Sequence, residues 1–464
     1  MRIKNSMQHF INADCAQKNP IRVAFVGNIA NNFFREVHAL QRCTDIDAVL
    51  YMASEPGTSN TELPESDDPK LAGNYPDWIR ILPKLPLLSP ALYFRWWPKP
   101  SSICKLFAEL DSYDICILSG LEVIFIPHLS TKTIYRATGS DLTVFPIFSF
   151  KEYCQLRPNI SPSLFRNPLK FIHQFISYNL MRAAYRKAIR SANYINSSPA
   201  DPYRIALDEL GVSKKRRIDM FLLAINTRLF LKDANKAAKA ASRWGIEGFN
   251  FVVFMPSRLM IRDTNLHVRT GQWKASDQAI YQYKALLESL SDEERSKVIL
   301  LIPDRTHSDD LQLAKKLICN QKIEENVMFL KGDSQAGLTR DELIQLYSLS
   351  DVVLDDFGSG WYGSVVVEAL ACSCPTITYA SEAVMERFPW HPIQIAKTSE
   401  QIYQSLKFLY SHAEKRKDIA NRSRLWIEEF HSEKSVSKKI ACSLKVLMSD
   451  SDCSDNINGQ TRLG

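Results

Sequence analysis

A glycine-rich loop between two apolar runs has the residue types needed to bind an anionic ligand. The apolar run Val352–Leu354 predicts a buried strand, and the run 364–372 after the loop predicts a helix. The loop contains Gly358, Gly360 and Gly363. Glycines at such a junction let a ligand approach the backbone, and the free N–H groups of the following helix favour a phosphate. Glu368 lies in the early turns of this helix, where a carboxylate can accept hydrogen bonds from hydroxyl groups of the same ligand.

Two cations stand at the corresponding end of an earlier apolar run. Residues 251–258 predict a buried strand that delivers Arg258 at its carboxyl end, the edge where open α/β sheets bind ligands. Lys274 follows sixteen residues later and opens a predicted helix. Paired cations in a dry cleft stabilise the negative charge that a departing diphosphate develops. Arg269 is a rival for the role of Arg258.

Strand-like and helix-like segments alternate in two blocks of similar size, which predicts the α/β class. The expected strands of the first block are 21–26, 48–52, 114–118, 133–136 and 194–196. Those of the second block are 251–258, 298–303, 327–332, 352–354 and 376–379. Right-handed crossovers then give two Rossmann-like, doubly wound domains that face a central cleft. Residues 53–72 are polar and predict an exposed loop.

Composition excludes several classes of protein. The chain has 464 residues, of which 45% are hydrophobic and 23% charged, values typical of a globular protein with two or three domains. No stretch approaches the roughly 20 apolar residues that span a bilayer, and the N-terminus has no apolar core of signal-peptide length. We therefore expect a cytoplasmic protein without a nucleic-acid partner. The 10 cysteines lack zinc-site spacing, so we expect reduced thiols and no metal site.

Two basic and aromatic segments raise the question of membrane contact. Residues 78–100 mix prolines with aromatic and basic side chains, among them Trp96 and Trp97. Residues 161–194 predict a basic helix with an aromatic and apolar component. Both compositions suit an anionic membrane surface, so peripheral contact with the inner face of a membrane is one interpretation. The alternatives are an irregular segment packed on the core for the first, and a solvated helix face for the second.

The segment 362–377, YGSVVVEALACSCPTI, resembles the donor-binding segment of retaining glycosyltransferases of the GT-B fold, in particular glycosyltransferase family 4. The family pattern has two glutamates separated by seven residues, then alanine, a small stretch, proline and a β-branched pair. Glu368 matches the second glutamate, which by this resemblance binds the ribose of a nucleotide sugar. Gly360 stands at the position of the first glutamate, and Asp355 and Asp356 are the candidates to replace it. The resemblance assigns donor binding to Gly360, Tyr362, Gly363, Ser364 and Glu368.

The resemblance extends to residues of both blocks. In the family, an arginine after the first strand of the second domain and a lysine at the next helix grip the donor diphosphate without a metal. This implies catalytic roles for Arg258 and Lys274. The sequence Gly-Ser-Asp-Leu resembles a loop of the family's first domain, so Asp141 is expected to be a catalytic residue that accepts a hydrogen bond from a sugar hydroxyl, or only to cap the helix that follows. Gly27 and Asn28 are then expected near the acceptor or the reacting sugar, as part of the donor site.

The resemblance also divides the chain. Residues 1–20 are expected to be a flexible leader, 21–226 an N-terminal acceptor domain, and 227–424 a C-terminal nucleotide-sugar donor domain. In GT-B proteins the last helices cross back onto the first domain, so a helix at about 425–447 is expected to complete it. Residues 449–464 are polar and are expected to form a disordered tail.

Together these features predict a glycosyltransferase of the hexosyltransferase type. It would move a sugar from a nucleotide-sugar co-substrate to a glycan or lipid-linked acceptor, with retention of configuration and without a metal or other cofactor. A role in cell-surface polysaccharide biosynthesis suits the basic and aromatic segments. Two alternatives stay open. A nucleotide-sugar epimerase would need further His and carboxylate residues in the cleft. A non-catalytic relative that binds sugar or a partner is favoured by Gly360.

Overall fold

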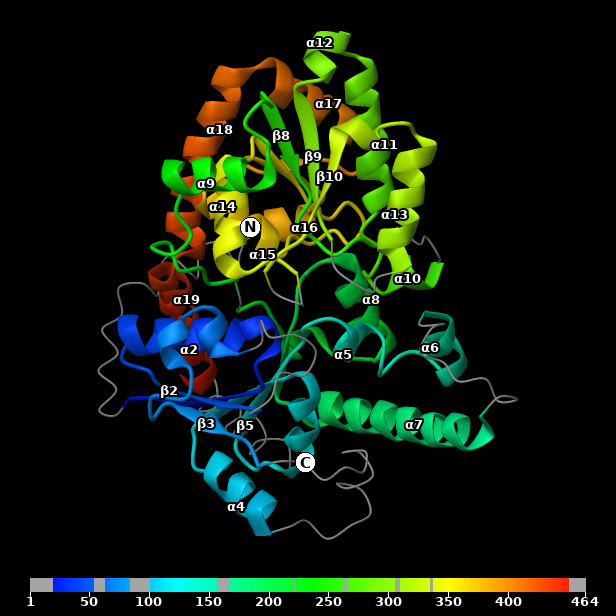
Figure 1. Ribbon diagram of the computed structural model, residues 1–464. Helices are drawn as coiled ribbons and strands as arrows, with labels where there is room; N and C mark the ends of the chain where they lie inside the picture. The colour runs from blue at the N-terminus through cyan, green and yellow to red at the C-terminus, as the bar shows by residue number, and fades with distance from the viewer. Residues whose placement is uncertain are drawn as a thin grey trace.

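The computed structural model describes residues 20–53, 63–83, 101–156, 167–220, 222–261, 265–304, 309–333 and 337–449. The described chain forms two halves, each built on a parallel β-sheet flanked by helices, and the halves meet across the middle of the molecule (Figure 1). The predicted leader (apart from Pro20), both Trp96 and Trp97, and the predicted tail (apart from Ser449) lie outside the described residues.

The described residues of the first half form a seven-stranded parallel sheet in the order β3-β2-β1-β4-β5-β6-β7. The strands are β1 (Arg22–Val26), β2 (Asp47–Met52), β3 (Ile79–Ile81), β4 (Ile115–Ser119), β5 (Lys132–Arg136), β6 (Tyr194–Asn196) and β7 (Arg217–Ile218). The helices are α2 (Asn32–Cys43), α4 (Ser101–Leu110), α5 (Ser140–Thr143), α6 (Phe150–Leu156), α7 (Pro168–Ser191) and α8 (Asp201–Glu209). The central strands are apolar and buried, because helices cover the sheet.

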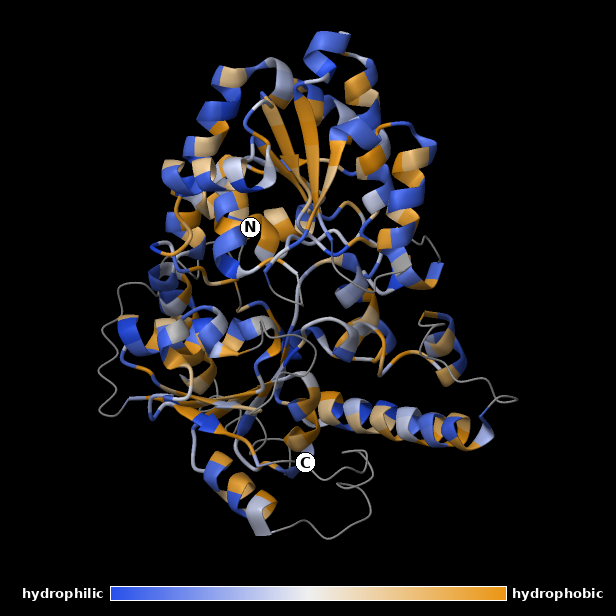
Figure 2. Cartoon of the chain, in the orientation of Figure 1, coloured by the Kyte–Doolittle hydropathy of each residue, from blue (hydrophilic) through white to orange (hydrophobic). Residues whose placement is uncertain are grey.

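The described residues of the second half form a six-stranded parallel sheet in the order β10-β9-β8-β11-β12-β13. The strands are β8 (Phe251–Phe254), β9 (Val298–Pro303), β10 (Val327–Leu330), β11 (Val352–Leu354), β12 (Thr376–Thr378) and β13 (Gln394–Ile395). The helices are α9 (Ala234–Trp244), α10 (Asn265–Arg269), α11 (Ser276–Glu288), α12 (Asp292–Arg295), α13 (Asp309–Asn320), α14 (Arg340–Leu349), α15 (Ser364–Ala371), α16 (Glu382–Met385), α17 (Ser399–Ser411), α18 (Ala413–Trp426) and α19 (Glu433–Ser449). Figure 2 shows the apolar strands of this sheet enclosed by helices with polar outer faces.

The predicted fold class is confirmed, since both halves are doubly wound α/β units. Three strands were missed, β3, β7 and β13, and all are edge strands of two or three residues, too short to show a strand period. The strand predicted at 251–258 ends at Phe254, so Arg258 lies in the loop beyond it. The prediction of an exposed loop at 53–72 is partly wrong. Residues 63–71 contain two short 3₁₀ turns and are largely half-buried.

The C-terminal end of the described chain returns to the first half. After α18, a π-helical turn at Ile427–His431 leads into α19, which packs along α2 (Figure 1). The Glu433 carboxylate lies 3.1 Å from His38, and Lys445 forms an ion pair of 3.2 Å with Asp45. The backbone carbonyl of Leu447 accepts a hydrogen bond of 2.7 Å from Lys132 on β5. The last helix is therefore part of the first half in space.

His431 sits at the point where the chain passes between the halves. Its side chain is fully buried, with Nδ1 2.8 Å from the Leu223 carbonyl and Nε2 3.1 Å from the Tyr362 hydroxyl. Nδ1 must therefore carry the proton and donate to Leu223, while Nε2 accepts from Tyr362. Burial lowers the pKa of His431 to about 3. The neutral ring thus connects the backbone at Leu223 to Tyr362, two residues before α15.

We expect the free energy of unfolding to fall as the pH drops from about 6.5 to about 3. In this window the unfolded chain binds a proton at His431 and the folded chain does not, so His431 removes up to roughly 5 kcal/mol of stability. Urea denaturation of the wild type and of His431→Gln at pH 7 and pH 5 measures the effect. The loss between the two pH values should shrink in the variant; an equal loss in both proteins would contradict this assignment.

Helix α7 projects from the body of the first half, with α6 near its far end (Figure 1). Its early turns carry large apolar side chains that face solvent, including Leu169 at 80% exposure and Phe175 at 48%. Beside Phe175 lies a groove of about 850 Å³ between α6 and α7. None of the described helices is long and apolar enough to cross a membrane.

Candidate functional site

Lys274 lies where two central strands of the second sheet end side by side. Because β8 and β11 pair in parallel, their carboxyl ends meet at the edge of the sheet that points toward the first half (Figure 1). The Lys274 ammonium is 3.2 Å from the hydroxyl oxygen of Ser257. It is 3.7 Å and 3.8 Å from the nearest carboxylate oxygens of Asp355 and Asp356. A predicted catalytic cation therefore stands at the edge where open α/β sheets bind ligands.

The loop between β11 and α15 packs on the backbone at Lys274. The Phe357 N–H donates a hydrogen bond of 3.0 Å to the Lys274 carbonyl. A Cβ atom at Gly358 would collide with the Trp273 carbonyl, so only glycine allows this approach. Ala275 adopts a left-handed conformation, φ 51°, and α11 starts at the next residue. The helix predicted to open at Lys274 therefore begins two residues later, and Lys274 lies in the loop.

Asp355 and Asp356 support this loop. Asp355 accepts a hydrogen bond from the Ser257 hydroxyl, and Asp356 accepts from the N–H groups of Gly358 (2.9 Å) and Ser359 (2.8 Å). Burial raises the pKa of Asp356 above its usual value, and the charge of Lys274 offsets this only in part. Both carboxylates are thus buried and bonded to protein groups.

The two candidate arginines lie outside this cluster. Arg258 is exposed, and its guanidinium lies 3.6 Å from the sulfur of Met260. Its rival Arg269 forms an ion pair with Glu209 of α8, which links the two halves. Arg269 also lines the cavity described next. Arg258 thus contacts Met260, whereas Lys274 faces Ser257, Asp355 and Asp356.

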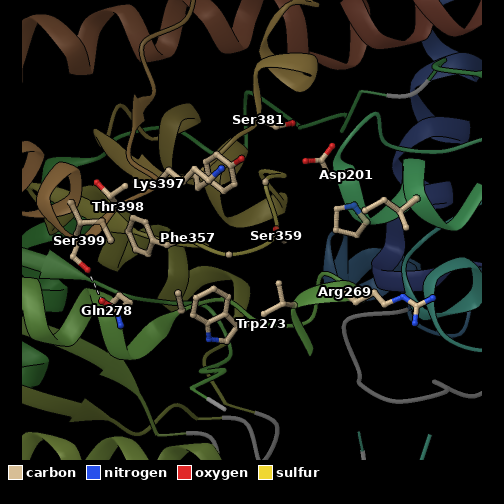
Figure 3. A pocket seen from close by; sticks show the side chains of 18 residues that line it. Asp201, Arg269, Trp273, Gln278, Phe357, Ser359, Ser381, Lys397, Thr398 and Ser399 are labelled. Atoms are coloured by element: carbon tan, nitrogen blue, oxygen red, sulfur yellow. Dashed lines mark hydrogen bonds between the residues drawn. The ribbon is translucent and has the colours of Figure 1, made fainter. Parts of the chain in front are cut away.

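A cavity of about 590 Å³ opens beside the β11–α15 loop, between the halves (Figure 3). Aromatic side chains form part of its wall, namely Trp273, Phe357 and Tyr379. Its polar groups include Asp201 from α8 of the first half and Lys397 from the second. An apolar wall with a few polar groups is typical of a small-molecule site, and the volume lies in the range of such pockets.

Gly360, at the position of the missing glutamate, lies on the cavity wall. Its φ of +72° is in the left-handed region, and a Cβ atom there would lie 3.2 Å from a ring carbon of Tyr379. The Gly360 carbonyl accepts a hydrogen bond of 2.9 Å from the Ser381 N–H. A glutamate at this position would thus be strained at this φ and would have to displace the Tyr379 ring.

Gly360→Ala is expected to lower the free energy of unfolding by about 1–2 kcal/mol, because an L-residue is strained at this φ and must also displace the Tyr379 ring. Gly248→Ala is the matched control, since a Cβ atom at Gly248 meets nothing within 4 Å and no left-handed φ is needed there. Urea denaturation of the two variants makes the comparison. Equal stabilities would show that Gly360 is not constrained.

The residues predicted around the start of α15 divide into two groups. Ser364 is the first residue of the helix, and Gly363 precedes it without any side-chain cap on the helix N–H groups. Tyr362 faces the other way, since its ring is fully buried against Trp426 and its hydroxyl bonds His431. The helix start could receive an anion, whereas the Tyr362 side chain belongs to the core.

Glu368 is buried in a ring of four charges. Its Oε1 lies 2.6 Å from Arg340 and 3.5 Å from Arg35, and its Oε2 lies 3.4 Å from the Tyr347 hydroxyl. Arg35 and Arg340 also contact Asp67, at 2.7 Å and 3.2 Å. Two of these residues come from each half, so the predicted ribose-binding carboxylate lies at their junction.

The predicted residues of the first half also serve its local structure. A Cβ atom at Gly27 would lie 2.6 Å from the Ser119 carbonyl, so the turn after β1 requires glycine. The side-chain oxygen of Asn28 accepts a hydrogen bond of 3.1 Å from the Phe34 N–H in α2. Asp141 is 4% exposed and accepts from the backbone N–H groups of Thr138 and Leu142, while burial raises its pKa to about 6.

Several residues that the structure brings to the site have no motif in the sequence. Tyr379 ends a predicted strand and Trp273 precedes a predicted helix, while Arg35, Asp67 and Arg340 are far apart in the chain. Their roles depend on how the two halves meet, which no local pattern reports. Only the position of Trp273, next to Lys274, could have drawn attention to it.

Comparison with known proteins agrees with this geometry. Residues 269–426 match the model of the family described as glycosyl transferases group 1. The match covers α11 to α18 and includes Lys274, Gly360 and Glu368. No curated protein sequence matches the chain.

Several solved structures have a similar fold. HepE of Anabaena in complex with UDP-glucose has a TM-score of 0.59 at 14% identity, over 92% of this chain and 100% of that one. A glycosyltransferase of Rickettsia africae has a TM-score of 0.59 at 14% identity, over 93% and 98%. Sucrose-phosphate synthase of Thermosynechococcus elongatus has a TM-score of 0.55 at 10% identity, over 93% and 100%. At these identities the likeness shows the fold.

The two Rossmann-like halves and the family match define a glycosyltransferase of the GT-B fold. The predicted class, a glycosyltransferase, is thereby confirmed.

Proposed function

We propose that this enzyme transfers a hexosyl unit to a glycan or lipid-linked acceptor with retention of configuration and without a metal, in cell-surface polysaccharide biosynthesis. The observation that carries the proposal is Lys274, whose ammonium stands at the carboxyl ends of β8 and β11 and whose chain neighbours Trp273 and Ala275 line the cavity of Figure 3. A diphosphate at this edge would meet a cation and free N–H groups, and a sugar would extend into the cavity.

The proposed contribution of the protein to catalysis is electrostatic stabilisation of the leaving diphosphate. When the bond between the sugar and the diphosphate breaks, negative charge grows on the leaving group. Lys274 and the N–H groups of α15 would stabilise that charge, and Arg258 would join them if its loop turns inward on binding. Because these groups are already charged or polarised in place, no metal ion is needed to neutralise the diphosphate. Retaining transfer of this class also needs no dedicated side-chain base.

The cavity is the proposed place of the donor sugar. With Gly360 in place of a glutamate, hydroxyl recognition would pass to Ser381, Asp201 and Lys397, while Tyr379 and Trp273 offer apolar faces to the ring. The buried Ser381 hydroxyl has no hydrogen-bond partner among the described residues. From the first half, Asp141 would act as a catalytic residue, and Gly27 and Asn28 would contribute to the donor site near the acceptor or the reacting sugar.

We assign residues 21–226, completed by 425–447, to the acceptor domain and 227–424 to the donor domain. The acceptor domain would lie at the cytoplasmic face of an anionic membrane. Helix α7 supports this, because exposed Leu169 and Phe175 stand beside the basic residues Lys170 and Lys151. Sedimentation with vesicles of phosphatidylglycerol and phosphatidylcholine at low salt tests it. The wild type should bind, and the double variant Leu169→Asp/Phe175→Asp should not; no binding by the wild type removes the membrane part of the proposal.

Titration with UDP and UDP-glucose tests the donor site, because HepE binds these ligands. GDP, ADP, dTDP and their glucose or mannose conjugates complete the panel. Binding in the presence of EDTA, followed by slow release of the nucleotide from the conjugate, would support a metal-independent transferase. Binding without any release would instead favour a non-catalytic relative, which Gly360 allows. No binding of any nucleotide would remove the donor site.

A further inference from the structure

The four-charge ring around Glu368 is the most constrained set of ionic groups between the two halves. Each of its carboxylates contacts both guanidinium groups. Arg35 grips Asp67 with two nitrogens, at 2.7 Å and 3.1 Å. The side-chain amide of Asn31 donates a further hydrogen bond of 2.8 Å to Asp67. Four ion pairs and the hydrogen bond from Asn31 therefore hold the ring together.

The ring is also dry. The side chains of Arg35, Asp67, Arg340 and Glu368 are 11%, 10%, 17% and 3% exposed. Burial by itself would raise the pKa of Asp67, but Arg35, Arg340 and Asn31 together hold it below the usual value. Charges this far from water are stable only when every partner is present. The ring thus exists in full when the halves touch and loses two members when they separate.

Arg340 bridges Asp67 of the first half and Glu368 of the second half. One of its terminal nitrogens lies 2.6 Å from Glu368 Oε1, and the other lies 3.2 Å from Asp67 Oδ1. With Asp67 in place the guanidinium cannot rotate away from Glu368. Glu368 Oε2, which contacts only the Tyr347 hydroxyl at 3.4 Å among the bonds seen here, is then left for a further donor.

We propose that Arg340 and Asp67 are positioning residues that set the Glu368 carboxylate for the donor ribose when the two halves close. This inference rests on the proposed function and on the sequence-based expectation that Glu368 is the carboxylate that binds the donor ribose. Closure and nucleotide binding then favour each other, since the closed state offers a fixed acceptor oxygen and the open state does not. Asp67, in a segment without any recognised motif, becomes a determinant of donor affinity.

Three variants test the proposal. Asp67→Asn removes the charge that holds Arg340, and Arg340→Lys keeps a charge but cannot bridge two carboxylates as a planar fork can. Asp219→Asn is the matched control, because Asp219 of the first half pairs with Arg387 of the second at 3.1 Å and takes no part in the ring. The titrant is the member of the UDP, GDP, ADP and dTDP panel that the wild type binds most tightly.

We expect Kd for that nucleotide to rise about tenfold in Asp67→Asn and in Arg340→Lys, and to stay unchanged in Asp219→Asn. At saturating nucleotide, small-angle scattering should give a larger radius of gyration for Asp67→Asn than for the wild type. A variant that melts earlier but binds nucleotide like the wild type would show that the ring is only structural and would overturn the proposal. If the wild type binds no nucleotide, the proposed donor site is wrong. If the wild type binds a nucleotide and Asp67→Asn and Arg340→Lys bind it with the same Kd, only this inference is wrong.

Discussion

Lys274→Ala is expected to lower kcat/KM for the nucleotide sugar by about 10²–10³, with intact folding. The Lys274 ammonium is the cation that the structure places at the carboxyl ends of β8 and β11. Its loss removes positive charge at the point where the leaving diphosphate becomes more negative, so the transition state suffers more than the ground state. The rate of nucleotide release at several donor concentrations measures the effect.

Two further variants sharpen this test. Lys274→Arg keeps the charge beside Asp355 and Asp356 and should recover part of the lost rate. Lys297→Ala removes a lysine from the far end of the same half, where it pairs with Glu293, and should leave the rate unchanged. A Lys274→Ala enzyme with the wild-type kcat/KM and a wild-type melting temperature would contradict the assignment.

Glu368→Ala is expected to destabilise the protein by about 3–5 kcal/mol, the cost of leaving buried guanidinium groups without their partner. Arg340 and Arg35 are the groups concerned, and Glu368 is 3% exposed. Glu368→Gln keeps an acceptor oxygen and should lose less. Urea denaturation at pH 7 measures both.

The control for this prediction is Glu293→Ala, because the Glu293 side chain is 84% exposed and its ion pair with Lys297 lies in water. A change within about 0.5 kcal/mol is expected there. If Glu368→Ala unfolds at the same urea concentration as the wild type, the ring is not formed in solution as it is in this structure.

Much of the fold could be predicted because buried parallel strands are recorded in the sequence as apolar runs. Val298–Pro303 and Ile115–Ser119 are such runs, and each became a central strand. The edge strands β7 and β13 could not be predicted, since two residues show no period. The end of β8 was placed too late because Met255 and Pro256 prolong the apolar run but not the strand.

The site was predictable only where its residues are close in the chain. The loop with Gly358 and Gly360 and the nearby start of α15 form one local unit, and a motif could show it. Lys274 was found through its position after a strand. The cavity and the charge ring could not be found, because Asp201 reaches the cavity wall of the second half, and Arg340 reaches Asp67, only through the contact of the two halves.

Asp67 illustrates the limit most clearly. In the sequence it belongs to a polar stretch rich in Glu, Asp, Ser and Pro, which normally indicates exposure. In the structure its side chain is 10% exposed, because two arginines from different halves neutralise it. Partners distant in sequence decided its burial, and composition could not reveal them.

The central claim is that the carboxyl edge of the second sheet binds a nucleotide sugar. The most direct measurement is titration calorimetry of the nucleotide and nucleotide-sugar panel, with EDTA present, on the wild type and on Arg258→Ala, Lys274→Ala and Glu368→Ala, each checked for folding. The account predicts that one nucleotide sugar binds the wild type and that binding is weakened in all three variants. A wild type that binds none of the panel, or folded variants that all bind like the wild type, would contradict it.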